Sequence, residues 1–192
     1  FTSWEIPRRY PAVLEDEKYG GAARGLLKDA KSMLKEIIEG DLLRAGAKYG
    51  FWKANSDGDD IVVFDEEGGS EKVRLNMLRQ QQDRGSSNYA CLSDFIAPLD
   101  SNRVDHIGMF AVTAGIGADD LSNGFKEEGD DYRAIMSSLL ADRLAEAAAE
   151  WLHRKVRGEW GFPDPDNLTM EDILNERYRS IRPAYGYPAC PD

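Results

Sequence analysis

The apolar residues near the start of the chain repeat with the period of a helix. Between residues 19 and 39 they recur three or four positions apart, at Leu26, Ala30, Met33, Leu34, Ile37 and Ile38. Residues at this spacing share one face of an α-helix, so the pattern is typical of an amphipathic helix. Gly40 follows, and glycine is favoured just past a helix end. The pattern predicts a helix over residues 19–39.

The middle of the chain has the features of β-structure. In KYGFWKANSDGDDIVVFDE, residues 48–66, aromatic and β-branched residues flank a cluster of turn-forming residues at positions 55–58. This arrangement predicts a hairpin. Shorter strand-like runs follow at residues 72–75 and 95–97. The run HIGMFAVTAG, residues 106–115, is the strongest candidate for a buried strand.

Helical spacing returns over residues 119–156. We expect one apolar face to carry Leu140, Leu144, Ala147 and Trp151, with a break near Gly129. Two prolines at positions 163 and 165 end this region, since proline cannot continue a helix. A short helix is predicted from an N-cap at Thr169, with Asp172 three residues on, to about Tyr178.

The order of these elements predicts the fold class. Strands are bracketed by helices, without the regular alternation of strand and helix that builds a parallel sheet. We therefore expect an α+β protein, a mainly antiparallel twisted sheet flanked by helices, and a single domain over residues 1–192.

Composition and charge exclude several classes of protein. Of the 192 residues, 42% are hydrophobic and 31% are charged, as in an ordinary soluble globular protein. No apolar run reaches the roughly 18 residues that a membrane span needs, so no membrane partner is expected. The net charge of −11 argues against nucleic acid, whose phosphates bind a surplus of lysine and arginine.

The cysteines and the start of the chain indicate its setting. Cys91 and Cys190 lie far apart and lack the CxxC spacing of a zinc site, so no metal is expected, and a reducing cytoplasm fits best. The opening residues FTSWEIPRRYP, which begin at Phe1, lack the pattern of a signal peptide. We expect this chain to be a piece of a longer protein.

Three motifs resemble known sites and favour simpler interpretations. TAGIGADD, residues 113–120, lacks the third glycine of a dinucleotide fingerprint, which favours a tight turn from strand to helix. NSDGDDIVVFDE, residues 55–66, resembles a calcium loop but has Asp60 where glycine is required, which favours a hairpin turn. His106 and His153 lack partners at metal-ligand spacing, which favours structural roles.

Charged residues of the second half suggest a ligand. Asp142, Glu146 and Glu150 fall four residues apart on one helix face, which is either a solvated face partly neutralised by Arg143 and Arg154 or a site for a cation. Glu176 lies six residues before Arg182, in the proline-rich closing segment SIRPAYGYPACPD. Guanidinium groups bind carboxylates through paired hydrogen bonds. A ligand with a carboxylate, a positive group and a flat ring, such as an amino-acid derivative, matches this set.

Longer segments in the same order resemble a known family. RPAYGYPACPD, DDYRAIMSSLLADRLAEAAAEWLHRKVR and CLSDFIAPLD are similar to the C-terminal activation domain of cobalamin-dependent methionine synthase. The resemblance begins at FTSW and YPAVLEDE and covers nearly the whole chain. Several segments in one order are more specific than any single short motif.

The resemblance implies a module that binds S-adenosylmethionine within a methyltransferase, and it implies no catalytic residue in this piece. In the family, an electron from flavodoxin or a flavodoxin-like reductase and the methyl group of S-adenosylmethionine return inert cob(II)alamin to the cycle. Cobalamin and zinc are bound by separate domains of the whole enzyme, and the cobalamin-binding domain is the implied partner. VDHIGM, residues 104–109, lacks the spacing of a cobalamin motif, so this chain is not expected to bind cobalamin tightly by itself.

Individual residues inherit roles from the resemblance. Arg182 is expected to hold the methionine carboxylate, Tyr187 to line the ligand pocket, and backbone groups near Ala189 to read the adenine. The prolines are expected to keep this segment extended, with its backbone polar groups facing the ligand. Glu146 and Glu176 match acidic residues near the ligand amino group, and Asp142 matches an acid that meets the cobalamin domain.

Some positions depart from the family pattern. Tyr185 stands where the family usually has proline, and Ala118 stands where relatives are often acidic. A ligand-binding aspartate is expected upstream of Phe1, and an aromatic pair beyond ACPD, so the piece is expected to lack the start and the C-terminal part of the family domain. The alternative is a docking module that binds a corrinoid protein or a reductase without S-adenosylmethionine.

Overall fold

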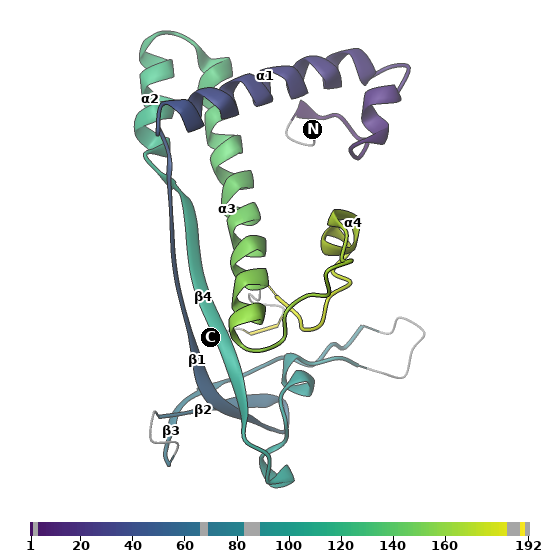
Figure 1. The fold of residues 1–192 in the computed structure, drawn as a ribbon, viewed down its shortest axis with the longest axis vertical. Helices are drawn as coiled ribbons and strands as arrows, with labels where there is room; N and C mark the ends of the chain where they lie inside the picture. Colours follow the sequence, from purple (N-terminus) through teal and green to yellow (C-terminus); the bar gives the residue numbers. More distant parts are fainter. Residues whose placement is uncertain (2–3, 66–68, 83–88, 184–188, 191–192) are drawn as a thin grey trace. The chain divides into compact units, whose positions relative to one another are not determined.

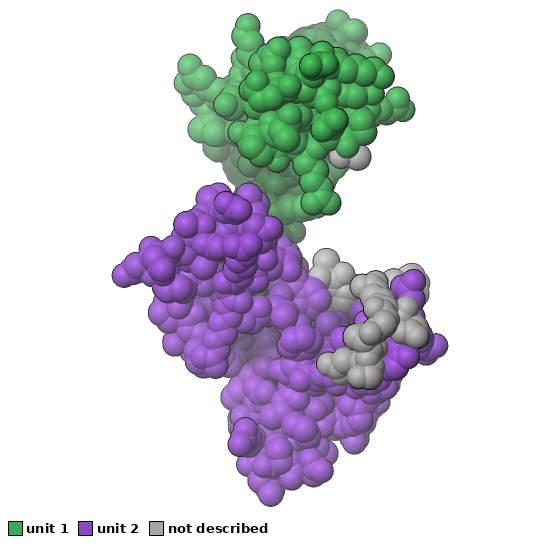
Figure 2. Space-filling view, turned by 90° about the vertical axis from the view of Figure 1, so that its right-hand side faces the viewer, with its two compact units in different colours: residues 1–47, 112–156 green, residues 48–111, 157–192 purple. Residues whose placement is uncertain are grey.

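A computed structural model describes residue 1 and residues 4–65, 69–82, 89–183 and 189–190. The chain forms two compact units, shown in different colours in Figure 2. Unit 1 contains residues 1–47 and 112–156, and unit 2 contains residues 48–111 and 157–192. Each unit is therefore built from two separate stretches of sequence.

Unit 1 is mainly helical. It contains the short 3₁₀ helix η2 (Ala12–Glu15), α1 (Gly20–Glu39), α2 (Ala118–Glu127) and most of α3 (Asp131–Glu159) (Figure 1). Side chains of α1, α2 and α3 form one core, which consists of Met33, Ile37, Phe125, Ala134 and Met136. The predicted helix over residues 19–39 is confirmed, and Gly40 caps its end.

Two glycines mark the expected ends of helices in unit 1. Gly117 joins strand β4 (Asp105–Ile116) to α2 with φ of 94°, and a Cβ on it would approach the Leu42 carbonyl oxygen to 2.7 Å. Only glycine fits this turn without strain. The tight turn predicted for TAGIGADD is therefore confirmed. Gly129, with φ of 78°, separates α2 from α3, which confirms the predicted break.

The described strands form one sheet in the order β3-β2-β1-β4. Its strands are β1 (Arg44–Asp57), β2 (Asp60–Phe64), β3 (Glu71–Leu75) and β4 (Asp105–Ile116). β1 pairs antiparallel with β2, and β2 pairs antiparallel with β3. Together with the helices, this sheet confirms the predicted α+β class.

The predicted hairpin is present, with a turn that differs from the expected one. Asp57 pairs with Asp60, so the turn residues are Gly58 and Asp59 rather than positions 55–58. Gly58 has φ of 62°, the left-handed conformation that two-residue hairpin turns require. Asn55 and Ser56 continue the strand and are buried, because their side chains bond to backbone carbonyls of residues 96, 97 and 103.

Two strand predictions need correction. Residues 92–95 form a 3₁₀ helix, η3 (Leu92–Phe95), where the sequence predicted a strand around 95–97. The Asp94 carboxylate accepts a bond from the Cys91 backbone N–H at 2.8 Å, which favours this turn over extended backbone. β4 is a strand but is not buried, since most of its residues are exposed or half-exposed. It stands at the end of the strand order, where an apolar run lacks a second neighbour.

The buried face of α3 differs from the predicted one. Trp151 is 61% exposed and Ala147 is also exposed, whereas the buried positions are Ala134, Met136, Ser137, Ala141, Ala149, Leu152, His153 and Arg157. The larger Leu140 and Leu144 are half-buried. Small, apolar and polar side chains are therefore all buried along α3, and the predicted face is only partly buried.

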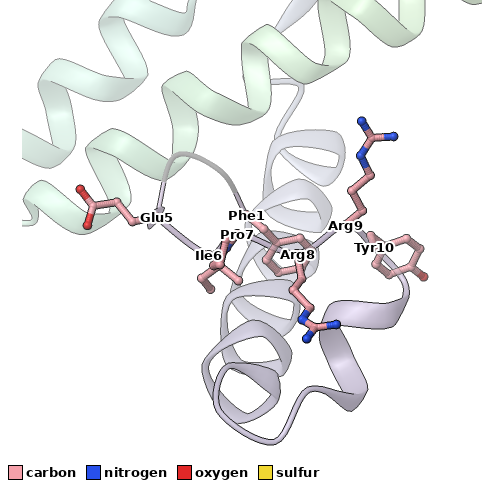
Figure 3. Close-up of a pocket in the computed structure, with 7 residues that line it drawn as sticks. All are labelled: Phe1, Glu5, Ile6, Pro7, Arg8, Arg9 and Tyr10. Atoms are coloured by element: carbon pink, nitrogen blue, oxygen red, sulfur yellow. The ribbon is translucent and has the colours of Figure 1, made fainter.

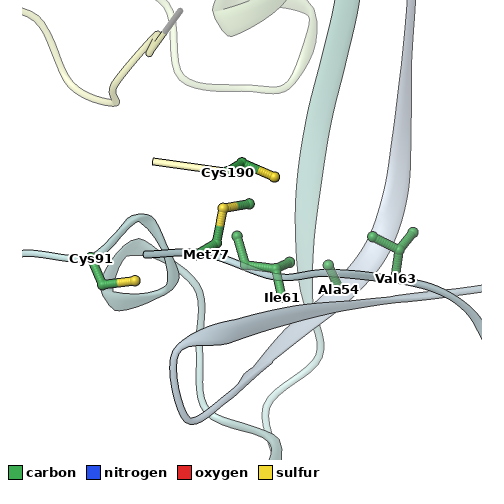
Figure 4. Packing of buried hydrophobic residues seen from close by; sticks show 6 residues of the cluster. All are labelled: Ala54, Ile61, Val63, Met77, Cys91 and Cys190. Atoms are coloured by element: carbon green, nitrogen blue, oxygen red, sulfur yellow. The ribbon is translucent and has the colours of Figure 1, made fainter. Parts of the chain in front are cut away.

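The core of unit 2 includes the end of the described chain. Ala54, Ile61, Val63, Met77 and Cys91 pack with Cys190, which is 4% exposed (Figure 4). Figure 4 shows the Cys190 side chain beside Met77. The tail is therefore anchored to the sheet by a buried side chain.

A short helix precedes the tail. α4 (Met170–Leu174) begins after Thr169, as predicted, but ends before Tyr178. The Thr169 hydroxyl oxygen accepts a bond from the Asp172 N–H at 3.1 Å, and the Asp172 carboxylate accepts one from the Thr169 N–H at 3.0 Å. The Thr169 hydroxyl also donates to the Asp172 carboxylate at 2.6 Å. This bond first, and then the bond from the Thr169 backbone N–H, lower the pKa of Asp172. No helix among the described residues is long and apolar enough to span a membrane.

Candidate functional site

The tail of unit 2 carries the residues that the sequence analysis placed around a carboxylate. Arg182 is half-buried, and its Nε atom is shielded from solvent. Glu176 is exposed and follows α4 with φ of 54°, a left-handed conformation that is uncommon for glutamate. Tyr187 and Tyr185 lie outside the described residues. We call residues 182–190 the ligand strip.

The turn that follows α3 is fixed to the end of that helix by a buried ion pair. The Arg157 guanidinium donates to the Asp164 carboxylate at 2.7, 2.8 and 3.0 Å. The side chains are only 5% and 4% exposed. Such paired hydrogen bonds between charged groups are short and directional. The turn that follows α3 is thereby held in one orientation.

Two stacking contacts connect this turn to residues 178 and 179. The Arg157 guanidinium lies over the Tyr178 ring at 4.0 Å, and the Arg179 guanidinium lies over the Phe162 ring at 4.2 Å. Each of the two segments contributes one cation and one ring. We call the five residues Arg157, Phe162, Asp164, Tyr178 and Arg179 the clamp. The clamp holds the chain three residues before Arg182.

The far end of the ligand strip is fixed to the sheet. The Leu78 N–H donates to the Ala189 carbonyl oxygen at 2.8 Å, just beyond β3. Cys190 follows in the core. The strip is therefore tied down at Ala189 and Cys190, and the clamp holds the chain that leads to its first residue. The Ala189 carbonyl accepts this bond from Leu78, and the expectation that backbone groups of the strip face a ligand stays a prediction.

The acidic residues predicted on the long helix belong to unit 1. Asp142 and Glu146 are exposed on α3, and Glu146 forms an ion pair with Arg143 at 3.3 Å. Glu150, the third carboxylate of the stripe, is half-buried. Glu176, Arg182 and Ala189 thus belong to unit 2, while Asp142 and Glu146 belong to unit 1.

Two surface hollows occur elsewhere. One of about 570 Å³ is lined by Phe1 and residues 5–10 (Figure 3). There, Arg8 forms an ion pair with Asp16 at 2.7 Å. Another of about 660 Å³ lies beside the hairpin turn and η3. None of the predicted site residues lines either hollow.

The hairpin turn behaves as a structural element. Asp57 pairs with Arg74 at 2.9 Å, and Arg79 bridges Asp59 at 2.7 Å and Asp94 at 2.8 Å. The hydrogen bonds from Arg79 hold the pKa of Asp94 below its ordinary value. With these carboxylates paired to arginines across the turn, the hairpin interpretation of residues 55–66 is confirmed for its described part.

The histidines and acidic groups show no metal centre in the described part of the chain. There, no three His, Cys, Asp or Glu side chains gather in a way that could hold a metal ion. His153 is buried in α3, and the exposed His106 lies edge-on to Trp160 at 5.3 Å. The structural roles expected for both histidines stay predictions.

Comparison with known proteins identifies the family. Residues 1–192 match the family described as "Vitamin B12 dependent methionine synthase, activation domain". The chain belongs to this family. It is also similar to a solved activation domain, "Crystal Structure of the MetH Reactivation Domain bound to AdoHcy", with 43% identity and a TM-score of 0.88. The match covers 100% of this chain and 59% of that chain.

These matches confirm the predicted family and fold of this activation domain. They do not test the roles of single residues, so the roles of Arg182, Tyr187, Ala189, Glu146, Glu176 and Asp142 stay predictions. Sequence reasoning missed the clamp. Arg157 and Asp164 are seven residues apart on either side of a helix end, and no spacing rule connects such a pair. Arg–Tyr stacking likewise has no short sequence signal.

Proposed function

We propose that this chain binds S-adenosylmethionine and presents its methyl group to a cobalamin held by another domain of methionine synthase. One observation carries the proposal: a domain that is 43% identical over the whole of this chain has been solved with AdoHcy bound. AdoHcy is S-adenosylmethionine without the transferred methyl group, so the two share a carboxylate, an amino group, a ribose and an adenine.

The chemistry of the ligand strip fits this ligand. Arg182 supplies a half-buried guanidinium for the carboxylate. Glu176, six residues earlier, supplies a carboxylate for the amino group, and the resemblance assigns Glu146 to the same group. Tyr187 lines the pocket, and the backbone at Ala189 reads the adenine. Because the strip is tied at Ala189 and Cys190, ligand binding needs little ordering of the chain there.

The role of the chain is placement. In the whole enzyme, one electron from a flavodoxin-like reductase and the methyl group of S-adenosylmethionine together convert cob(II)alamin to methylcobalamin, and the carbon–sulfur electron pair leaves with AdoHcy. This chain holds the sulfonium so that its methyl carbon points toward the partner domain. Asp142, exposed on α3, is the residue we assign to contact with that domain.

The carboxylate contact gives a direct test. Replacing Arg182 with alanine removes the charge-assisted pair, which contributes about 1.5–3 kcal/mol, so affinity for S-adenosylmethionine is expected to fall roughly 10- to 150-fold. Isothermal titration measures this change. Arg103→Ala, which removes an exposed arginine of the same unit, is the matched control and is expected to leave affinity unchanged.

Unchanged affinity in Arg182→Ala would reject the role of Arg182 and leave ligand binding standing. Absence of binding in the unaltered chain, and in the same chain with its flanking segments, would favour the alternative, a docking module that does not use S-adenosylmethionine.

A further inference from the structure

We propose that Arg157 is a positioning residue for ligand binding. Through the clamp it sets where the ligand strip begins and thereby where the Arg182 guanidinium lies. The inference rests on the proposed function, because it concerns the same ligand. Arg157 itself is 5% exposed and bonded to Asp164, so its contribution is transmitted through the chain.

The geometry of Arg157 uses features that only arginine has. Its planar guanidinium donates from Nε and a terminal nitrogen to both oxygens of Asp164, while its face lies over the Tyr178 ring. Lysine keeps the charge but has neither the planar fork nor the stacking face. The edge of the group therefore fixes the turn after α3, and its face fixes residue 178.

The short distance along the chain carries the effect to the ligand. Four residue steps separate Tyr178 from Arg182, which span at most roughly 14 Å even when fully extended. Between them, Ser180 has φ of 95°, a conformation that costs energy for any residue except glycine. Such a conformation persists only when the chain on both sides is held. The clamp holds one side.

Burial indicates that this pair supplies geometry more than stability. Removing two charges from water costs several kcal/mol per ion, and buried pairs often contribute no more stability than apolar replacements of similar volume. An arginine and an aspartate that are both almost fully buried are therefore a costly way to stabilise a turn. The pair does hold the turn after α3 in one orientation, because its hydrogen bonds and the stacking of Arg157 on Tyr178 are directional.

The chain offers a matched control. Arg133 in unit 1 also combines a carboxylate and a ring, since it contacts Glu36 at 2.5 Å and lies over Phe125 at 4.1 Å. It is distant in sequence from the ligand strip and belongs to the other unit. Arg133→Lys removes the same kinds of contact as Arg157→Lys without touching the clamp.

The experiment compares two ligands across these variants. S-adenosylmethionine and 5′-methylthioadenosine are each titrated into the chain extended by its flanking segments, and isothermal titration calorimetry measures both affinities. 5′-Methylthioadenosine lacks the carboxylate that Arg182 would hold. Arg157→Lys is expected to weaken S-adenosylmethionine about tenfold or more, because small misplacements of a binding group have effects of this order. It should leave 5′-methylthioadenosine nearly unchanged, and Arg133→Lys should change neither.

The outcomes separate this inference from the proposed function. If the unaltered chain does not bind S-adenosylmethionine, both are overturned. If it binds and Arg157→Lys weakens neither ligand, or weakens both equally, only the positioning role is overturned. Should Arg157→Lys fail to fold, Tyr178→Leu removes the stacked ring and keeps the ion pair. That variant is then expected to show the same selective loss, and unchanged affinity for S-adenosylmethionine contradicts the inference.

Discussion

The clamp in unit 2 and the Arg133 site in unit 1 use the same chemical groups in different surroundings. Each places a guanidinium over an aromatic ring and against a carboxylate, at ring distances of 4.0 and 4.1 Å. The Arg157 side chain is 5% exposed, whereas that of Arg133 is 35% exposed and its partner Glu36 is 51% exposed. Contact type is therefore the same, and burial differs.

Burial decides how strongly such a contact fixes the chain. An exposed pair keeps most of its hydration and is worth little to the fold, so it joins α1 and α3 loosely. A buried pair leaves a strongly unfavourable charge behind when either partner is lost, so its geometry is enforced. The described residues after α4 form no helix or strand, so their placement depends on enforced contacts of this kind.

The largest effect is expected from breaking the buried pair. Asp164→Ala leaves the Arg157 guanidinium buried without its carboxylate, and the free energy of unfolding is expected to fall by about 3–5 kcal/mol. Glu36→Ala removes the corresponding partner of Arg133 and is expected to cost no more than about 1 kcal/mol. Urea unfolding of both variants measures the contrast. Equal losses of unfolding free energy in the two variants would show that burial does not determine how much each ion pair contributes.

A smaller effect is expected at the helix that leads into the tail. Thr169→Ala removes the N-cap hydroxyl of α4 and is expected to lower the free energy of unfolding by about 1 kcal/mol. Thr169→Ser keeps the hydroxyl and should stay close to the unaltered chain. Thermal unfolding compares the two. If serine and alanine behave alike, the capping bond contributes nothing.

Acid is expected to weaken unit 2 at the hairpin. Hydrogen bonds from Arg79 keep the pKa of Asp94 below the ordinary value of 3.8 in the folded chain. The resulting stability is fully present above 3.8 and is lost as pH falls below that value toward the folded pKa. Arg79→Gln should raise the pKa of Asp94 and make unfolding less dependent on pH in this window. NMR titration of the Asp94 carboxyl group measures the shift, and an unchanged pKa would contradict the assigned cause.

The smallest effect on the fold is expected on α3. Glu146 is 71% exposed and pairs only with the equally exposed Arg143 in the described contacts, so Glu146→Gln should change the free energy of unfolding by less than about 1 kcal/mol. Its affinity for S-adenosylmethionine should nevertheless fall if Glu146 meets the ligand amino group. Calorimetric titration of S-adenosylmethionine measures the binding role, and urea unfolding measures the role in stability. Unchanged affinity for S-adenosylmethionine would mean that Glu146 is only part of a solvated helix face.

Much of the fold could be predicted because local rules decide it. Period and capping located α1, the break at Gly129 and the start of α4. The strand pattern located the hairpin, although the turn lies at Gly58 and Asp59 because Asn55 and Ser56 find backbone partners within the fold. The resemblance of whole segments gave the family.

Features set by distant contacts could not be predicted. The buried positions of α3 include Ser137, His153 and Arg157, while Trp151 is exposed, because the packing of the folded chain decides which positions are covered. β4 is exposed because its place in the strand order is a tertiary property. Arg157, Asp164 and Tyr178 meet only in the folded chain, so no spacing in the sequence indicates that they contact one another.

The most direct test of the account is calorimetric titration of S-adenosylmethionine into the 192-residue chain and into the same chain with its flanking segments. The account predicts saturable binding with one ligand per chain in at least the longer form, and competition by AdoHcy at the same site. Absence of binding by both forms, with each shown to be folded by circular dichroism, would contradict it.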